Sequence, residues 1–269
     1  MHDKHPTHIT FGILNQHKSE VLHFSSTRNG GVSKGTNLSL NLGFHEGDSD
    51  ENVVANRKIL ATNAGFDFER LVVAQQTHSA NVATVDESSK GKGIFSKSSA
   101  IQDCDAFICS TPNICIVVQT ADCVPILLFD PRKKVVAAIH AGWRGTTKRI
   151  AQQTLSKMRE EYNCDTNDIV AAIGPSIGSC CYEVGIDVIE EVTKNLPSDA
   201  EACLIPSDNV GKMIFDVRLA NKLQLIESGI QTSNIEVSNI CTKCNHTNFF
   251  SARYDRNKTG RMMSGIMLR

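Results

Sequence analysis

The sequence predicts an α+β domain with mixed β-sheets. Its length of 269 residues and its hydrophobic share of 41% are typical of a globular chain with a sizeable buried core. Short segments rich in β-branched residues, several linked as hairpins, are interspersed with four segments of helical periodicity. No internal repeat divides them. We therefore expect a single catalytic domain over residues 21–269, preceded by a mobile segment over residues 1–20.

The elements are expected in the following order. A helix over 51–65 ends at Gly65, a residue that favours a helix stop. The other predicted helices cover 146–162, 185–195 and 216–228, and the predicted strands cover 71–75, 114–118, 124–129, 135–139, 169–173 and 262–268. The Ser-, Gly- and Lys-rich stretch 87–99 is expected to be a mobile loop.

A glycine-rich stretch, residues 27–48, contains few large apolar side chains. Its Asn-Gly-Gly turn accepts positive φ at little cost. The stretch is either a surface loop or a cradle whose backbone amides approach a ligand, with Arg28 at its lip.

Charge and composition exclude several classes of protein. The 28 basic and 29 acidic side chains leave a net charge of −1, whereas a general nucleic-acid binder shows a basic excess. No apolar run approaches the roughly 20 residues of a membrane span. The N-terminus has no apolar region of the kind that secretory signals contain. We expect a cytoplasmic protein that binds neither nucleic acid nor membrane, as a monomer or a homodimer.

The ten cysteines are interpreted mostly as free thiols, because a chain of this size needs no disulfide framework. Cys109 and Cys115 lie in apolar runs and are expected to pack as small hydrophobes. The vicinal pair Cys180–Cys181 follows a glycine-containing turn that could carry a site loop.

A second group, Cys241, Cys244 and His246, resembles half of a zinc knuckle. A closed structural zinc site needs four ligands, and no second ligand pair follows in the remaining residues. We therefore interpret these thiols as packed or loop residues.

The densest chemistry lies in residues 119–144. Two apolar strands flank Asp130-Pro131-Arg132-Lys133, a sequence typical of a β-turn. A two-residue loop would place Cys123 opposite His140, with their Cβ atoms about 5 Å apart. A longer loop would shift this register. A thiolate and an imidazole at such a separation can share a metal ion, or act as nucleophile and base.

A third candidate ligand, His78, directly follows the predicted strand 71–75 in a polar stretch. Two histidines and one thiolate leave a zinc ion one open coordination position, which is typical of catalytic sites. Asp122 and Glu183 are candidate proton carriers, although either is alternatively an ion-pair partner of Arg144.

With these residues in place, the chain resembles the YfiH/LACC1 family, also labelled "multicopper polyphenol oxidase" or "laccase domain". The matching motifs are TRNGGVSKG (27–35), SLNLGFHEGD (39–48), QQTHS (75–79), QTADCVPILLFD (119–130), AAIHAGWRGT (137–146), AAIGPSIGSCCYEVG (171–185) and FFSARYDRNKTGR (249–261). They cover nearly the whole chain. TADCVP together with HAGWRG is highly specific.

The resemblance implies an α/β/β/α sandwich and a zinc ion bound by two histidines and a cysteine, which match His78, His140 and Cys123. It also implies a purine nucleoside phosphorylase, which uses phosphate to split adenosine, inosine, guanosine or methylthioadenosine into the base and ribose 1-phosphate or its derivative. Deamination of adenosine to inosine is implied as a side activity. The motif residues Arg28, Asn41 and Arg144 are our candidates for phosphate and substrate contacts, because guanidinium groups fit phosphate oxygens.

Three other functions are alternatives to this one. The first is an amidase acting on cell-wall precursors, in which Cys123 is the nucleophile and His140 its base, or in which the metal serves hydrolysis. The second is a multicopper oxidase, which needs many histidines in His-x-His pairs; this chain has nine histidines and no such pair. Copper remains an adventitious or alternative metal for a site of this composition. The third is a zinc-binding module without catalytic activity.

Overall fold

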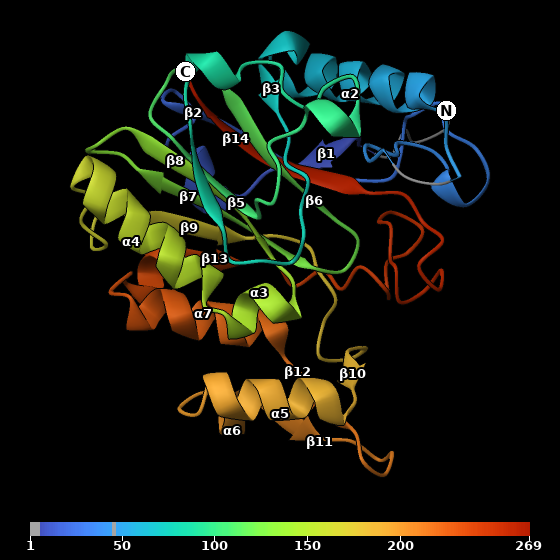
Figure 1. The fold of residues 1–269 in the computed structure, drawn as a ribbon, viewed down its shortest axis with the longest axis vertical. Coiled ribbons are helices and arrows are strands. Elements are labelled where there is room, and N and C mark those ends of the chain that lie inside the picture. Colours follow the sequence, from blue (N-terminus) through green and yellow to red (C-terminus); the bar gives the residue numbers. More distant parts are fainter. Residues whose placement is uncertain (1–5, 45–46) are drawn as a thin grey trace.

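Two β-sheets stacked face to face, with helices on both outer faces, form the body of the molecule (Figure 1). This computed structural model describes residues 6–44 and 47–269. Helix α2 covers one sheet, and helices α3, α4 and α7 cover the other. The α/β/β/α sandwich with mixed sheets in a single domain is confirmed. No helix in these ranges is both long enough and apolar enough to span a bilayer.

The first sheet has five strands in the order β1-β2-β14-β6-β3. Their bounds are β1 His8–Ile9, β2 Val21–Ser26, β14 Met262–Leu268, β6 Cys115–Thr120 and β3 Leu71–Val72. All pairs are antiparallel except β3 with β6. The final strand of the chain thus lies in the middle of this sheet, so the C-terminal segment is part of the core.

The second sheet has six strands in the order β13-β9-β7-β8-β5-β4. Their bounds are β13 Ile235–Val237, β9 Val170–Ile173, β7 Val124–Asp130, β8 Val135–Ala141, β5 Ala106–Cys109 and β4 Val82–Val85. The outermost pairs are parallel and the central pairs antiparallel. Each of the central strands β7 and β8 is buried throughout, which explains their continuous apolar sequences.

The helices of the body and of a smaller lobe have these bounds: α1 Gly12–Asn15, α2 Asp50–Ala64, α3 Trp143–Thr147, α4 Ile150–Tyr162, α5 Ile186–Asn195, α6 Ala200–Cys203 and α7 Val217–Glu227. Short 3₁₀ turns occupy Gly35–Asn37, Phe68–Arg70, Glu87–Ser89, Lys97–Ser99 and Thr232–Asn234. Helix α2 starts where the Ser49 side chain accepts the Asn52 N–H, and stops at Gly65 in the left-handed conformation.

A third, three-stranded sheet was not expected from the sequence. It consists of β10 Glu183–Val184, β12 Met213–Phe215 and β11 Leu204–Pro206. With α5 and α6 it forms a lobe that projects from the body below α7 in Figure 1. Its strands are two or three residues long, too short for alternation to reveal them in the sequence.

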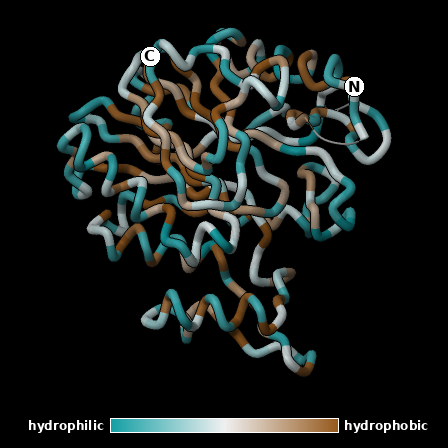
Figure 2. The backbone as a smooth tube through the Cα atoms, in the orientation of Figure 1, coloured by the Kyte–Doolittle hydropathy of each residue, from teal (hydrophilic) through white to brown (hydrophobic). Residues whose placement is uncertain are grey.

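The core lies mainly between the two large sheets. Hydrophobic residues gather along their strands, whereas the helices carry both hydrophilic and hydrophobic residues (Figure 2). Phe129 of β7, Val118 of β6 and Ile266 of β14 belong to one fully buried cluster shared by both sheets. This packing holds the strand ends in fixed positions, and the candidate site is built on those ends.

The segment over residues 1–20, which was expected to be mobile, contains regular structure in its described part. Residues 1–5 lie outside the described residues, but β1 pairs with β2, and Phe11 and Leu14 are buried in the core between the sheets. The His23 imidazole also accepts the Phe11 N–H at 2.9 Å. The burial of Phe11 and Leu14 attaches residues 6–20 to the sandwich.

The predicted helix 146–162 is interrupted. Arg149 adopts a left-handed conformation, with φ 59°, between α3 and α4. The Gln224 side chain of α7 donates to the Thr146 carbonyl at 2.9 Å, and Asn221 donates to the Thr146 hydroxyl. Side chains of α7 therefore satisfy polar groups of Thr146 near the end of α3. The periodicity of residues 146–162 alone could not reveal these contacts.

The register of the β7–β8 hairpin is shifted by two residues from the predicted one. Pro125, not Cys123, lies opposite His140, because the loop between Asp130 and Val135 contains four residues instead of two. A shift of two residues preserves the alternation of faces, since side chains on a strand repeat every second position. Cys123, just before β7, therefore still lies on the side of the hairpin that carries His140.

Candidate functional site

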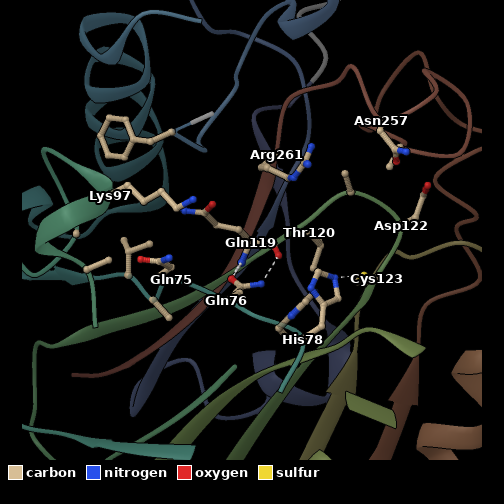
Figure 3. Close-up of a pocket in the computed structure, with 18 of the residues that line it drawn as sticks. Gln75, Gln76, His78, Lys97, Gln119, Thr120, Asp122, Cys123, Asn257 and Arg261 are labelled. Atoms are coloured by element: carbon tan, nitrogen blue, oxygen red, sulfur yellow. Dashed lines mark hydrogen bonds between the residues drawn. The ribbon is translucent and has the colours of Figure 1, made fainter. Parts of the chain in front are cut away.

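The three predicted ligands come together at one end of the six-stranded sheet. His78 lies in the segment between β3 and β4, Cys123 directly precedes β7, and His140 is near the end of β8. Their ligand atoms all lie within 4.8 Å of one another, and Cys123 Sγ is 3.9 Å from His78 Nε2 (Figure 3). These distances suit three ligands of a single metal ion.

A buried carboxylate organises this cluster. Asp105, just before β5, is fully buried, and its Oδ1 lies 2.7 Å from His140 Nδ1. Because a carboxylate only accepts, His140 donates through Nδ1, which leaves Nε2 as the nitrogen that would bind a metal in exchange for any proton it carries. Asp105 also accepts the backbone N–H groups of Thr77, His78 and Ser79. One carboxylate thus fixes both histidines, an arrangement common behind metal-binding imidazoles.

The electrostatics of the cluster favour its charged forms. Burial raises the pKa of the Cys123 thiol, but His140 and His78 outweigh burial and lower that pKa below its ordinary value. Burial lowers the pKa of His140, yet Cys123 and Asp105 outweigh it and raise that pKa. Burial likewise opposes ionisation of Asp105, but hydrogen bonds and the charge of His140 lower its pKa. A thiolate at Cys123 is the form that binds a metal or attacks an electrophile.

The backbone around the cluster is specialised. Gly142 has no room for a side chain, since a Cβ there would lie 2.9 Å from the His78 ring and 3.1 Å from Cys123 Sγ. His78 and Asp122 adopt left-handed conformations, with φ 60° and 91°. Such conformations are uncommon for residues other than glycine, although histidine and aspartate adopt them more readily than most.

Two glutamines position the segment that carries His78. The Gln76 side chain donates to the Gln119 carbonyl at 2.8 Å and accepts the Gln119 N–H at 2.6 Å (Figure 3). This pair of bonds imitates strand pairing beyond the end of β3. The Gln76 side chain therefore attaches this segment to β6. The expected strand 71–75 ends at Val72 because the backbone then changes partners: the Val73 N–H donates to Lys92, and the Gln75 N–H donates to Ile101.

A cavity of about 700 Å³ opens beside the cluster and includes His78, Cys123 and His140 in its wall. Its lining, as far as the described residues go, is strongly basic: the charged side chains other than histidine are Arg57, Lys97, Arg253, Arg256 and Arg261, with Asp122 as the acid among them. An excess of positive charge next to a candidate metal site favours an anionic ligand.

Two of these arginines are held by backbone carbonyls. Arg57 is buried, its Nη1 donates to Gly93 at 2.5 Å, and its Nη2 has no partner among the described residues. Burial lowers its pKa to about 9. Arg261 donates through Nη1 to Thr259 and Gly260, and its guanidinium lies above Thr120 in Figure 3. Their positions are therefore fixed before a ligand binds.

The structure does not bring the three predicted substrate contacts into the cavity wall. The Arg28 guanidinium donates to the carbonyls of Leu38 and His246. Asn41 is fully buried, and its side chain bonds to Asp48 and to the Arg261 backbone N–H. Arg144 is exposed and stacks on Trp143, 4.1 Å from its centroid. Their contact with a substrate stays a prediction.

The glycine-rich stretch 27–48 packs against α2. A Cβ at Gly31 would lie 2.2 Å from the Ser39 carbonyl, so this glycine allows a close approach within the loop itself. Of the described part of the stretch, Phe44 lines the cavity. Residues 45–46 of the 39–48 motif lie outside the described residues.

The two candidate proton carriers have different surroundings. Asp122 lines the cavity, but its carboxylate accepts the Thr242 hydroxyl at 2.6 Å and the Arg253 N–H at 2.7 Å. Glu183 lies on β10 outside the cavity lining and bonds to Asn209 and Lys212 instead of Arg144. Asp122 therefore holds two loops together, and Glu183 belongs to the smaller lobe.

Comparisons with known proteins identify the family of this chain. A family model described as "Multi-copper polyphenol oxidoreductase laccase" matches residues 22–269. A "Purine nucleoside phosphorylase" of Bacteroides thetaiotaomicron is 37% identical over 93% of this chain and 92% of that protein. "Purine nucleoside phosphorylase YlmD" of Bacillus subtilis is 37% identical over 94% of this chain and 90% of that protein. "Adenosine deaminase RL5", from an unknown prokaryotic organism, is 37% identical over 90% of this chain and 92% of that protein.

Solved structures also match this chain over almost its whole length. The hypothetical protein YfiH of Bacillus licheniformis matches with a TM-score of 0.93 and 35% identity, over 98% of this chain and 97% of that chain. YlmD of Geobacillus stearothermophilus matches with a TM-score of 0.85 and 35% identity, over 93% of this chain and 92% of that chain. The likeness extends over the whole described domain.

Proposed function

Since the chain belongs to the multi-copper polyphenol oxidoreductase laccase family, as its resemblance to YfiH and LACC1 indicated, we propose that it is a zinc-dependent purine nucleoside phosphorylase. The substrates would be adenosine, inosine, guanosine or methylthioadenosine together with phosphate. The products would be the purine base and ribose 1-phosphate or its derivative. The observation that carries the proposal is the basic cavity beside the His78–Cys123–His140 cluster.

The cavity suits a nucleoside and phosphate in size and charge. Its volume of about 700 Å³ lies within the range of small-molecule sites. Arg261, held from behind by two carbonyls, has the fork of donors that phosphate oxygens accept. Lys97 and the buried guanidinium of Arg57 add positive charge to the cavity wall. Arg261 and Lys97 would bind phosphate, and Arg57 would help to offset its charge.

The donor set fits zinc. Two imidazoles and a thiolate are common zinc ligands and leave a fourth position open. Copper also accepts such donors, so it remains the alternative metal. A bound zinc ion would supply a Lewis acid that orients phosphate or water and stabilises developing negative charge. Asp105 holds the proton of His140 on Nδ1, and Gly142 leaves the space into which the other two ligands project.

Deamination of adenosine to inosine is proposed as a second activity of the same site. The observation that favours it is the relative named adenosine deaminase. Deamination requires water, in place of phosphate, as the attacking group. The His78–Cys123–His140 cluster lines the cavity in which either water or phosphate would bind.

Product analysis distinguishes these activities. The zinc-loaded protein is incubated with adenosine, with and without phosphate, and the products are identified by mass spectrometry. Adenine with ribose 1-phosphate, formed only with phosphate, is expected. Inosine in both samples would make deamination the main reaction. The absence of product in both would refute the proposal and favour the amidase, in which Cys123 acts as the nucleophile.

We also place the protein in the cytoplasm. All ten cysteines are free, six of them buried. Free thiols are typical of proteins from reducing compartments.

A further inference from the structure

Four cysteines outside the cavity come together although they are distant in sequence. Cys180 and Cys181 follow β9, and Cys241 and Cys244 follow β13, more than fifty residues later. Their four sulfur atoms all lie within 4.8 Å of one another. The sequence interpretation of loop thiols was therefore incomplete, because the missing ligand pair lies upstream of Cys241 and not downstream.

We propose that these four cysteines form a second, structural zinc site. A tetrahedral ion with Zn–S bonds of about 2.3 Å separates its sulfurs by about 3.8 Å. Cys244 Sγ lies 3.4 Å from Cys181 Sγ and 3.6 Å from Cys180 Sγ, close to that separation. A disulfide would need a sulfur separation of about 2.0 Å. Four thiolates around one point are a closed ligand set, which distinguishes this site from the open cluster in the cavity.

The surroundings favour thiolates. The Gly178 N–H donates to Cys241 Sγ at 3.2 Å, a bond that stabilises negative charge on sulfur. A Cβ at Gly178 would lie 2.5 Å from Arg218 Nη2 and 3.2 Å from Cys180 Sγ. The Arg218 guanidinium and Cys180 Sγ thus both lie close to Gly178. The positive charge of Arg218 partly offsets the negative charge of a tetrathiolate zinc site. On binding, Zn²⁺ replaces the four thiol protons, which are released to solvent.

The site lies at the base of the smaller lobe and joins two loops that reach the cavity. A bridge pairs Ser176 with Cys241, and the Thr242 N–H donates to the Ser176 carbonyl at 3.0 Å. Tyr182, next to the cysteine pair, and Arg253 both line the cavity. Zinc at this position would hold both loops, and hence both side chains, without touching the substrate.

Metal stoichiometry tests the proposal. The full chain is purified under reducing conditions, and zinc per chain is measured by mass spectrometry. Cys244→Ser is expected to lose one zinc per chain relative to the wild type. Cys164→Ala, at a buried cysteine outside both clusters, is the matched control and should lose none. Equal zinc in the wild type and Cys244→Ser would overturn the proposal.

A second measurement does not depend on the folding of Cys244→Ser. His78→Ala removes a ligand of the cavity cluster only, so its remaining metal reports the four-cysteine site. After cobalt substitution, this variant should show the intense visible absorption and sulfur-to-metal charge transfer of a tetrahedral thiolate site. Three results would overturn the assignment: one iron in place of this zinc, a Cys181–Cys244 disulfide in the reduced preparation, or no bound metal.

Discussion

Replacement of Asp105 by asparagine is expected to weaken metal binding at the His78–Cys123–His140 cluster while preserving the fold. Oδ2 of Asp105 accepts four donors, the backbone N–H and the hydroxyl of Thr77 and the backbone N–H and the hydroxyl of Ser79. Oδ1 accepts two, from the His78 N–H and from His140 Nδ1. An asparagine keeps most bonds when its carbonyl oxygen takes the Oδ2 position. Its NH₂ group then occupies the position of Oδ1.

The NH₂ group would reverse the hydrogen bond to His140. Nδ1 would become the acceptor, and the imidazole proton would move to Nε2, the nitrogen needed for the metal. Loss of such a supporting carboxylate typically lowers metal affinity 10- to 100-fold. The His78 N–H would face a donor and remain unpaired, which costs about 1–3 kcal/mol of stability.

Competition with a chromophoric chelator measures zinc affinity, and urea unfolding measures stability. Asp130→Asn is the matched control, because Asp130 is equally buried but lies at the far end of β7. Its Oδ1 accepts the Arg132 and Lys133 N–H groups, and its Oδ2 has no partner in the described chain. An asparagine there keeps both bonds. Wild-type zinc affinity in Asp105→Asn would refute the proposed role of the carboxylate.

Three further changes test other parts of the structure. Cys123→Ala should lose both the cavity metal and turnover while its circular dichroism stays unchanged; full activity would show that the site is misassigned. Arg261→Gln should raise KM for phosphate about tenfold or more, since hydrogen bonds to charged groups contribute about 1.5–3 kcal/mol; an equal rise in KM for the nucleoside would contradict a phosphate role. Burial is the main cause that lowers the pKa of His23 from 6.5 to about 4. The unfolded chain therefore binds the proton first as pH falls, and stability should drop by about 2 kcal/mol between pH 7 and pH 5. Unfolding of His23→Gln should lack this component, and an equal drop in both proteins would exclude His23 as its source.

Local sequence patterns predicted the central parts of the fold well. The helix ending at Gly65 and the strand 262–268 appear where periodicity and stop signals placed them. The break at Arg149 and the three-stranded lobe were not predicted, because both depend on contacts with distant segments. The hairpin register was wrong by two residues, since turn residues alone do not distinguish a two-residue loop from a four-residue loop.

The candidate site was predicted in part. His78, Cys123 and His140 were identified and do lie together. Asp105 was missed, because an aspartate between strands carries no signal until the fold places it beside His140. The basic cavity wall was also missed, although its arginines Arg253, Arg256 and Arg261 lie within the quoted motif 249–261. Motif membership does not show which side chains face inward.

The left-handed conformations at His78 and Asp122 have a consequence for how this protein can change over evolutionary time. Each is expected to cost about 1–2 kcal/mol relative to glycine. Selection for heat resistance alone would thus favour glycine at both positions and would remove a ligand and a loop anchor. Thermostable variants that retain activity should instead acquire their stabilising substitutions elsewhere, for example in the smaller lobe.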